Sequence, residues 1–147
     1  MTDRSIPVPL PLAVWERDGL VAAVTKAGLP ADNLDSADAL FWRFENNDVP
    51  VGFGGLEIYG DQALLRSVVT LPPVRGCGVG SDIVALLETE ARIRGCRVVW
   101  LVGDKATEFF SGLGYRACEA SQAPQVIRET KSFARAETMT VMKKKLD

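Results

Sequence analysis

The spacing of hydrophobic and polar positions predicts how the chain begins. In Leu12–Ala27, apolar residues recur at intervals of about three and four residues, as on one face of an amphipathic helix. Gly28 and Pro30 follow, and both residue types commonly end helices. The polar stretch Ala31–Ala39 then predicts a loop or a short helix. We therefore expect an N-terminal helix over Leu12–Ala27, joined to the rest of the chain by a polar connection.

The pattern then changes to that of β-strands. Three runs rich in aromatic, β-branched or other apolar residues follow, at Phe41–Glu45, Val51–Ile58 and Ala63–Leu71. They are separated by Asn-Asn-Asp at 46–48 and by Gly-Asp at 60–61, which are typical of tight turns. Because tight turns join antiparallel strands, the pattern predicts an antiparallel meander.

The second half of the chain predicts further helices and strands after a glycine-rich turn at 75–80. The expected elements are a helix that Ser81 or Asp82 caps and Gly95 ends, a strand at Arg97–Val102, a helix at Lys105–Leu113, a strand at Tyr115–Ala120, a helix at Gln125–Arg135 and a strand at Thr138–Lys145. No repeat, low-complexity stretch or linker divides the chain. Residues 1–147 are therefore expected to form a single domain of the α/β (α+β) class around one mixed sheet.

Composition narrows the class of protein. The 147 residues are 47% apolar and 24% charged, close to the average of soluble globular domains. A formal net charge of -2 gives no electrostatic reason to expect nucleic acid or an acidic membrane as a partner. The amino terminus lacks the apolar core of an export signal, and no apolar run is long enough to span a membrane. Three cysteines without a CxxC pair are typical of reduced thiols, so a cytoplasmic protein is expected.

The absence of histidine limits the chemistry. The sequence contains none, which excludes histidine-based triads and most zinc sites and removes the commonest general base near neutral pH. Carboxylates, tyrosine, cysteine, backbone amides or a borrowed cofactor must then carry any reaction, and no metal site is expected.

The segment Val68–Ser81 carries the clearest functional signal. It has the pattern of a strand, a compact turn with Gly76, Gly78 and Gly80, and the start of a helix. Backbone N–H groups are unpaired at a helix start, the helix dipole adds partial positive charge, and glycine lets the backbone approach a phosphate. Arg75 adds a fixed cation beside the turn. The segment therefore predicts a phosphate-binding site.

Comparison with three known phosphate-binding patterns indicates which kind of phosphate site this is. A P-loop requires a lysine after its last glycine, whereas Ser81 follows Gly80. A dinucleotide fingerprint follows the first strand of a βαβ unit, whereas these glycines follow a meander. The pattern R/Q-x-x-G-x-G/A fits Arg75–Gly80 without a gap, and about 25 residues later Ala106–Tyr115 is similar to A-x-x-F-Y-x-x-L-G-F.

With these two signatures the chain resembles the GCN5-related N-acetyltransferase (GNAT) family, from about Val51 to the end. The resemblance implies a mostly antiparallel central sheet flanked by helices, acetyl-CoA as co-substrate and an amine as acceptor. In the family the amine attacks the thioester carbonyl directly, a backbone amide stabilises the oxyanion, and CoA thiolate leaves. The resemblance assigns pyrophosphate binding to Arg75, Gly76, Cys77, Gly78, Val79, Gly80 and Ser81, and contacts with pantetheine and thioester to the backbone of Val68, Val69 and Thr70.

The chain departs from the family pattern where the catalytic groups are expected. Phe110 stands where many relatives have a tyrosine acid, and Gly103 replaces a frequent asparagine. Tyr59 is a candidate substitute for the acid. Glu57 is the candidate base, because relatives often use a carboxylate on the central strands. The alternative for Glu57 is a solvent-facing strand residue.

Two arginines are candidate anchors for a substrate anion. Arg66 is a charge in an otherwise apolar run, and its partner is Glu57, another internal salt bridge or a substrate carboxylate. Arg128 lies in a segment that, with Tyr59–Ser67, resembles a narrower bacterial subgroup encoded beside arsenic-resistance genes and related to short glutamate N-acetyltransferases. That resemblance implies an amino acid or an arsenical amino-acid analogue as acceptor.

Other functions stay open at this point. A CoA-binding sensor or interaction module with a degenerate catalytic site is favoured by Phe110 and by the missing asparagine. An acyltransferase that uses a longer acyl chain is a further alternative. The sequence leaves the acceptor amine and the oligomeric state undetermined, with a homodimer as one option.

Overall fold

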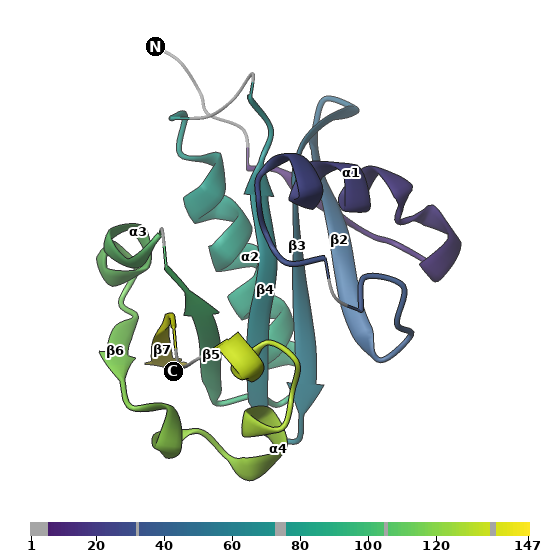
Figure 1. The fold of residues 1–147 in the computed structure, drawn as a ribbon. Helices are drawn as coiled ribbons and strands as arrows, with labels where there is room; N and C mark the ends of the chain where they lie inside the picture. The colour runs from purple at the N-terminus through teal and green to yellow at the C-terminus, as the bar shows by residue number, and fades with distance from the viewer. Residues whose placement is uncertain (1–5, 32, 73–75, 105, 136–137) are drawn as a thin grey trace.

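One seven-stranded sheet runs through the fold in this computed structural model, which describes residues 6–31, 33–72, 76–104, 106–135 and 138–147. The strands lie in the order β1-β2-β3-β4-β5-β7-β6 (Figure 1). Their bounds are Val8–Pro11 (β1), Ala39–Asn46 (β2), Val49–Tyr59 (β3), Gln62–Thr70 (β4), Val98–Gly103 (β5), Arg116–Cys118 (β6) and Thr140–Lys145 (β7). Among these strands β4 and β5 pair in parallel and all other neighbours are antiparallel, which confirms the expected mixed, mostly antiparallel sheet.

Helices cover both faces of this sheet (Figure 1). They are α1 (Asp18–Lys26), α2 (Val79–Ile93), α3 (Thr107–Gly112) and α4 (Gln125–Arg128), with 3-10 turns at Val14–Glu16, Ala120–Gln122 and Phe133–Arg135. Successive side chains along each strand point to opposite faces of the sheet and so pack against different helices. Leu65 of β4 packs with α2, while its neighbour Leu64 packs with α4 and Phe133, and Phe41 of β2 packs with α1.

The meander of β2, β3 and β4 is confirmed, and its first turn shows why it forms. Asn47 and Asp48 both have positive φ, 51° and 66°, as the tight turns of twisted hairpins require. Asn and Asp tolerate this left-handed conformation better than other non-glycine residues.

The N-terminal helix is shorter than expected. The apolar spacing predicted Leu12–Ala27, but α1 begins at Asp18. Arg17 is buried, and its guanidinium donates to the carbonyl oxygens of Leu34 (3.1 Å), Ser36 (2.5 Å) and Ala39 (3.1 Å). The side chain thereby joins the α1 start to the connection before β2, which spacing along one helix could not indicate.

Two further expectations about elements were wrong. Strand β1 was not predicted; it carries Pro9 and Pro11 and lies at the edge of the sheet, where proline is tolerated. The expected helix Gln125–Arg135 ends at Arg128, and the Thr130 hydroxyl donates to the Ile127 carbonyl oxygen at 2.7 Å just beyond it. Such a side-chain bond offers the backbone an alternative to continued helix.

A polar cluster is buried beneath α2. Glu88 is 6% exposed. It accepts a hydrogen bond from the Tyr115 hydroxyl (2.8 Å) and forms an ion pair with Lys144 Nζ (3.1 Å). Lys144 also donates to the Leu113 carbonyl oxygen at 2.8 Å, at the C-terminal end of α3. Lys144 thereby ties β7 to α2 and α3.

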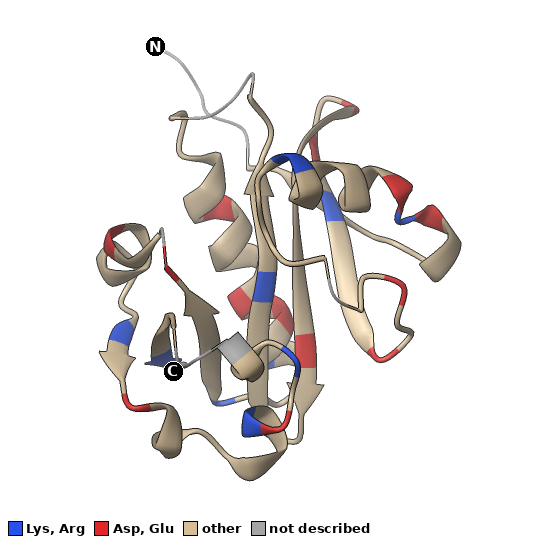
Figure 2. Ribbon diagram, viewed as in Figure 1, with Lys and Arg blue, Asp and Glu red and all other residues tan. Residues whose placement is uncertain are grey.

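Charge is dispersed over the molecule. Figure 2 shows acidic and basic residues of the described chain interspersed on helices, strands and loops. No helix in the described part of the chain is long and apolar enough to cross a membrane.

Candidate functional site

The parallel strands β4 and β5 separate after a short paired segment. Their register covers Gln62–Leu64 of β4 and Val98–Trp100 of β5, and beyond these residues the two strands are no longer paired. Backbone groups of β4 that face β5 in this region are therefore available to a ligand. The gap opens toward the start of α2 and toward α3 (Figure 1).

A β-bulge in β4 lies at the point of separation. On the β3 side, Phe53 pairs with Val69 and Gly55 pairs with Arg66, so two residues of β4 oppose one residue of β3. Ser67, in the bulge, has a positive φ of 58°. An extra residue of this kind bends a strand and redirects its side chains. The bulge thus turns β4 away from β5 where the gap begins.

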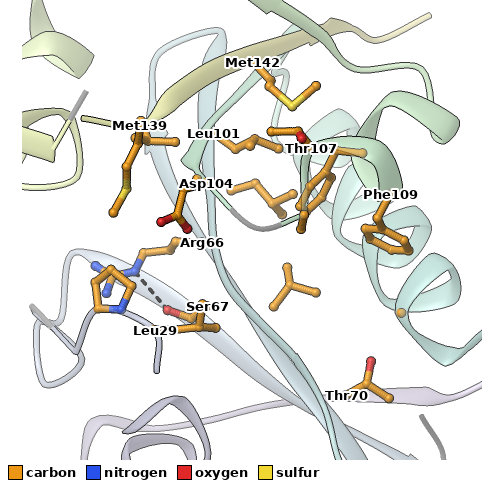
Figure 3. A pocket seen from close by; sticks show the side chains of 18 of the residues that line it. Leu29, Arg66, Ser67, Thr70, Leu101, Asp104, Thr107, Phe109, Met139 and Met142 are labelled. Atoms are coloured by element: carbon orange, nitrogen blue, oxygen red, sulfur yellow. Dashed lines mark hydrogen bonds between the residues drawn. The ribbon is translucent and has the colours of Figure 1, made fainter. Parts of the chain in front are cut away.

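The gap forms a cavity of about 800 Å³ (Figure 3). Its walls come from β4, β5, the glycine-rich turn, α3, the turn after α1 and the C-terminal segment. The lining residues are Gly28, Leu29, Pro30, Leu65, Arg66, Ser67, Val68, Thr70, Gly76, Gly78, Gly80, Ser81, Leu101, Val102, Gly103, Asp104, Ala106, Thr107, Phe109, Phe110, Ser132, Met139 and Met142. A mostly apolar cavity with a few polar groups is typical of a small-molecule site.

One end of the cavity is the glycine turn at the start of α2. The expected cap at Ser81 or Asp82 is wrong, because Gly78 precedes the first helical residue in the left-handed conformation (φ 82°) and no side chain caps the helix. The first backbone hydrogen bond of the helix runs from Asp82 N–H to the Gly78 carbonyl oxygen at 3.3 Å. The N–H groups of Val79, Gly80 and Ser81 therefore have no partner within the helix, as at any helix start.

Gly80 must be small for the cavity to reach this turn. A Cβ atom at this position would lie 3.3 Å from both Phe109 Cζ and Thr70 Oγ1. Cys77 is exposed on the same turn. Arg75, the cation expected beside the turn, lies outside the described residues.

On β3 and β4, three predicted residues meet in one cluster. Arg66 Nη1 donates to Glu57 Oε2 at 3.0 Å, and the Tyr59 hydroxyl donates to the other carboxylate oxygen. Glu57 is 8% exposed and is not among the described lining residues, whereas Arg66 lines the cavity. Burial, followed by the bond to Glu57, raises the pKa of Tyr59 above its ordinary value. Of the three partners considered for Arg66, the structure has Glu57.

Arg66 is also held from its other sides. Its Nε donates to Ser67 Oγ at 3.2 Å, and its guanidinium lies 5.5 Å from the centre of the Phe41 ring. A Cβ atom at Gly55 would collide with the Phe41 ring, so this glycine lets the ring lie close to the sheet beneath the guanidinium. An arginine held by a carboxylate, a hydroxyl and a ring has few accessible rotamers. Its charge at the cavity wall is therefore fixed in position.

The structure does not bring Arg128 to this cluster. Arg128 is exposed on α4, its Nε donates to the Ala123 carbonyl oxygen at 2.9 Å, and it is not among the described lining residues. Phe110 does line the cavity and packs edge-on against Phe109 and Tyr115, with ring centroids 5.1 and 5.4 Å apart. The position where relatives have a tyrosine therefore faces the cavity with a ring that has no proton to donate.

Sequence reasoning missed several residues at the other end of the cavity. Leu29, Ser132 and Met139 come from the turn after α1 and from the C-terminal segment, and no local motif marks them. Asp104 also lines the cavity, and its signal was available, because it directly follows β5. Residues at the carboxyl ends of neighbouring parallel strands commonly contact ligands.

Comparisons with solved structures agree with this architecture. The N-acetylglutamate synthase of Neisseria gonorrhoeae, complexed with coenzyme A and N-acetyl-glutamate, matches 99% of the chain with a TM-score of 0.79 and 13% identity, and the chain spans about a third (36%) of its length. Rv2747 from Mycobacterium tuberculosis, in complex with CoA and NLQ, matches 96% of this chain and 100% of its own (TM-score 0.76, 21% identity). Tetrahymena GCN5 matches 95% of this chain and 96% of its own (TM-score 0.74, 12% identity).

Comparison at the sequence level supplies the family. No curated protein matches the chain. The profile of the acetyltransferase (GNAT) family, however, matches residues 10–115, which include the meander, the bulge in β4, the glycine turn and α3. The chain therefore belongs to the acetyltransferase (GNAT) family.

Proposed function

We propose that the protein transfers an acetyl group from acetyl-CoA to the amine of a small molecule that also carries a carboxylate. The observation that carries this proposal is the cavity between β4 and β5, which extends from the α2 start to Arg66. It offers helix N–H groups at one end, an apolar passage between strands, and a positioned cation at the other end.

The residues of the cavity fit a CoA thioester. The glycine turn, from Gly76 to Ser81, would hold the pyrophosphate through backbone N–H groups, and Arg75 would add charge. The backbone of Val68, Val69 and Thr70, on the side left unpaired by β5, would contact the pantetheine arm and the thioester. When bound, the thioester supplies the activated acyl group. The chain's own contribution is to orient it and to place an amide near the carbonyl oxygen.

Arg66 supports an amino acid as the acceptor. A guanidinium binds a carboxylate through two parallel hydrogen bonds, and here the group is held at the cavity wall by its neighbours. The Neisseria and Mycobacterium structures hold N-acetyl-glutamate and NLQ together with CoA. An amino acid or an arsenical analogue of one is thus the acceptor we propose, while Arg128 as a second anchor stays a prediction.

The sequence also predicts Glu57 as base and Tyr59 as acid, and both stay predictions. For Glu57 to act it must reach the amine through a water molecule, because its side chain is buried and is not among the described residues that line the cavity. Under this hypothesis Glu57→Gln lowers the rate steeply at neutral pH, and an unchanged rate and pH profile would reject it.

Calorimetry and thiol release test the proposal together. We expect CoA and acetyl-CoA to bind, and free thiol to form with at least one member of a panel of amino acids, with the acetylated product identified by mass. Binding without thiol release would instead favour the CoA-binding sensor, which Phe110 supports by its lack of a proton donor. Competition with longer acyl-CoA thioesters tests the acyl-chain preference.

A variant of the glycine turn tests where CoA binds. Gly80→Val would place methyl groups against Phe109 and Thr70 and narrow the passage to the turn. We expect a loss of CoA affinity of about tenfold or more, or about 1.4 kcal/mol. Gly112→Ala is the matched control, since a Cβ atom there meets nothing within 4 Å and Gly112 is not a described lining residue. Equal affinity in both variants would contradict the proposed binding mode.

A further inference from the structure

Asp104 is the single carboxylate among the described residues that line the cavity, and Arg66 is the single cation. The remaining described lining residues, from the turn after α1, α3 and the C-terminal segment, are uncharged. In Figure 3 the Asp104 side chain points from the end of β5 toward the side of the cavity where Arg66 and Ser67 lie. The acceptor end of the cavity thus contains one positive and one negative group, among the described residues.

Strand register places Asp104 opposite the bulge of β4. Leu64 and Trp100 are the last paired residues of the two parallel strands. Four residues further along each strand, about 13 Å in extended chain, are Val68 on β4 and Asp104 after β5. Val68 begins the backbone segment that is proposed to hold the thioester. The carboxylate of Asp104 is therefore across the cavity from the position where the acceptor amine must approach.

Glu57 is in a poorer position to contact the amine. Its carboxylate is buried, accepts from Arg66 and Tyr59, and is not part of the described cavity wall. By contrast, Asp104 is exposed at the cavity, and no hydrogen bond or ion pair to it occurs among the described residues. An exposed carboxylate at a cavity mouth can also pass a proton to bulk water. The two carboxylates therefore suit different tasks.

We propose that Asp104 is the general base of the reaction and that Glu57 is a positioning residue for Arg66. This inference depends on the proposed acetyl transfer. The Asp104 carboxylate accepts one proton from the substrate ammonium and releases it to water. The nitrogen lone pair then forms the C–N bond at the thioester carbonyl carbon. As the C–S bond breaks, a second N–H proton reaches the sulfur through water, giving an amide and a free thiol.

Asp104→Asn tests the inference, because it removes the base and keeps the shape. We expect kcat/KM to fall by about 100-fold near pH 7, with CoA affinity unchanged. The deficit should shrink toward about pH 10, where solvent deprotonates the amine without help. It should also shrink, near pH 7, for an aromatic amine that is already neutral at that pH. A purely structural role would give the same deficit under all of these conditions.

Control variants separate the roles. Glu108→Gln changes the net charge equally on nearby exposed α3, outside the described cavity wall, and should leave kcat/KM unchanged. Asp104→Glu should restore part of the rate, because the carboxylate is retained. A deficit in Asp104→Asn that does not vary with pH or with the amine, or that lies in KM alone, overturns the inference. If the wild-type protein binds CoA but releases no thiol with any amine, the proposed transfer fails and this inference fails with it.

Discussion

Two buried glutamates on opposite faces of the sheet bond to the same kinds of side chain but differ in their position relative to the cavity. Glu57 accepts from Arg66 and Tyr59, and Glu88 accepts from Lys144 and Tyr115. Glu57 and Glu88 are 8% and 6% exposed, respectively. The first cluster includes a cation that lines the cavity, whereas no member of the second is a described lining residue. A buried carboxylate with a cation and a tyrosine is thus no sign of catalysis by itself, and position decides its role.

The largest effect is expected when Glu88→Ala breaks the second cluster. The change leaves Tyr115 without its hydrogen bond and Lys144 without its ion pair beneath α2. Breaking a buried pair costs more than the pair contributed, but the Lys144 side chain is 25% exposed and water will compensate in part. We expect the free energy of unfolding in urea to fall by about 2 kcal/mol. A loss below about 0.5 kcal/mol, the size of an ordinary surface substitution, would contradict the structural role.

An intermediate effect is expected from a matched pair of isosteric changes. Glu57→Gln weakens the hold on Arg66, so the KM for the acceptor should rise by about tenfold, or about 1.4 kcal/mol, while kcat changes less. Glu88→Gln keeps the shape of the other cluster and should leave both parameters unchanged per folded molecule. Steady-state kinetics on both variants checks this. A steep loss of kcat in Glu57→Gln would favour Glu57 as base instead.

The smallest effect is expected from alkaline pH. Burial first, and then Glu88, raises the pKa of Tyr115 above its ordinary value. Below about pH 10 the folded and unfolded states both keep the proton, so the stabilisation is fully present. Above about pH 10 the unfolded state loses the proton first and binds fewer protons than the folded state, so stability falls, by about 1 kcal/mol per pH unit.

Urea unfolding at about pH 9 and at about pH 11 measures this loss of stability. The drop should be reduced by a similar amount in Tyr115→Phe and in Tyr59→Phe, because burial raises the pKa of both hydroxyls well above the ordinary value and both stay protonated in the folded state. An undiminished drop in both variants would contradict the raised pKa of these two hydroxyls.

Local patterns were sufficient to predict the meander, the glycine turn and the long helix after it, because tight turns and helix starts depend on residues adjacent in sequence. The same reasoning failed at Arg17, because the helix begins only after this residue and its guanidinium bonds to carbonyl oxygens up to 22 residues away. Nor does any local pattern indicate that Lys144 bonds to the carboxylate of Glu88, 56 residues away. These contacts join distant segments, so the spacing of hydrophobic and polar residues along the chain does not indicate them.

The backbone end of the cavity could be predicted from the sequence, since the glycines and the unpaired N–H groups of a helix start lie within one short segment. The other end could be located only in the folded chain. There, Arg66, Asp104 and Met139 line one cavity because β4 bulges away from β5 and the C-terminal segment contributes to the cavity wall. A binding site formed from one segment can be recognised by its spacing, whereas a site formed by separated side chains depends on strand register and on the packing that sets it.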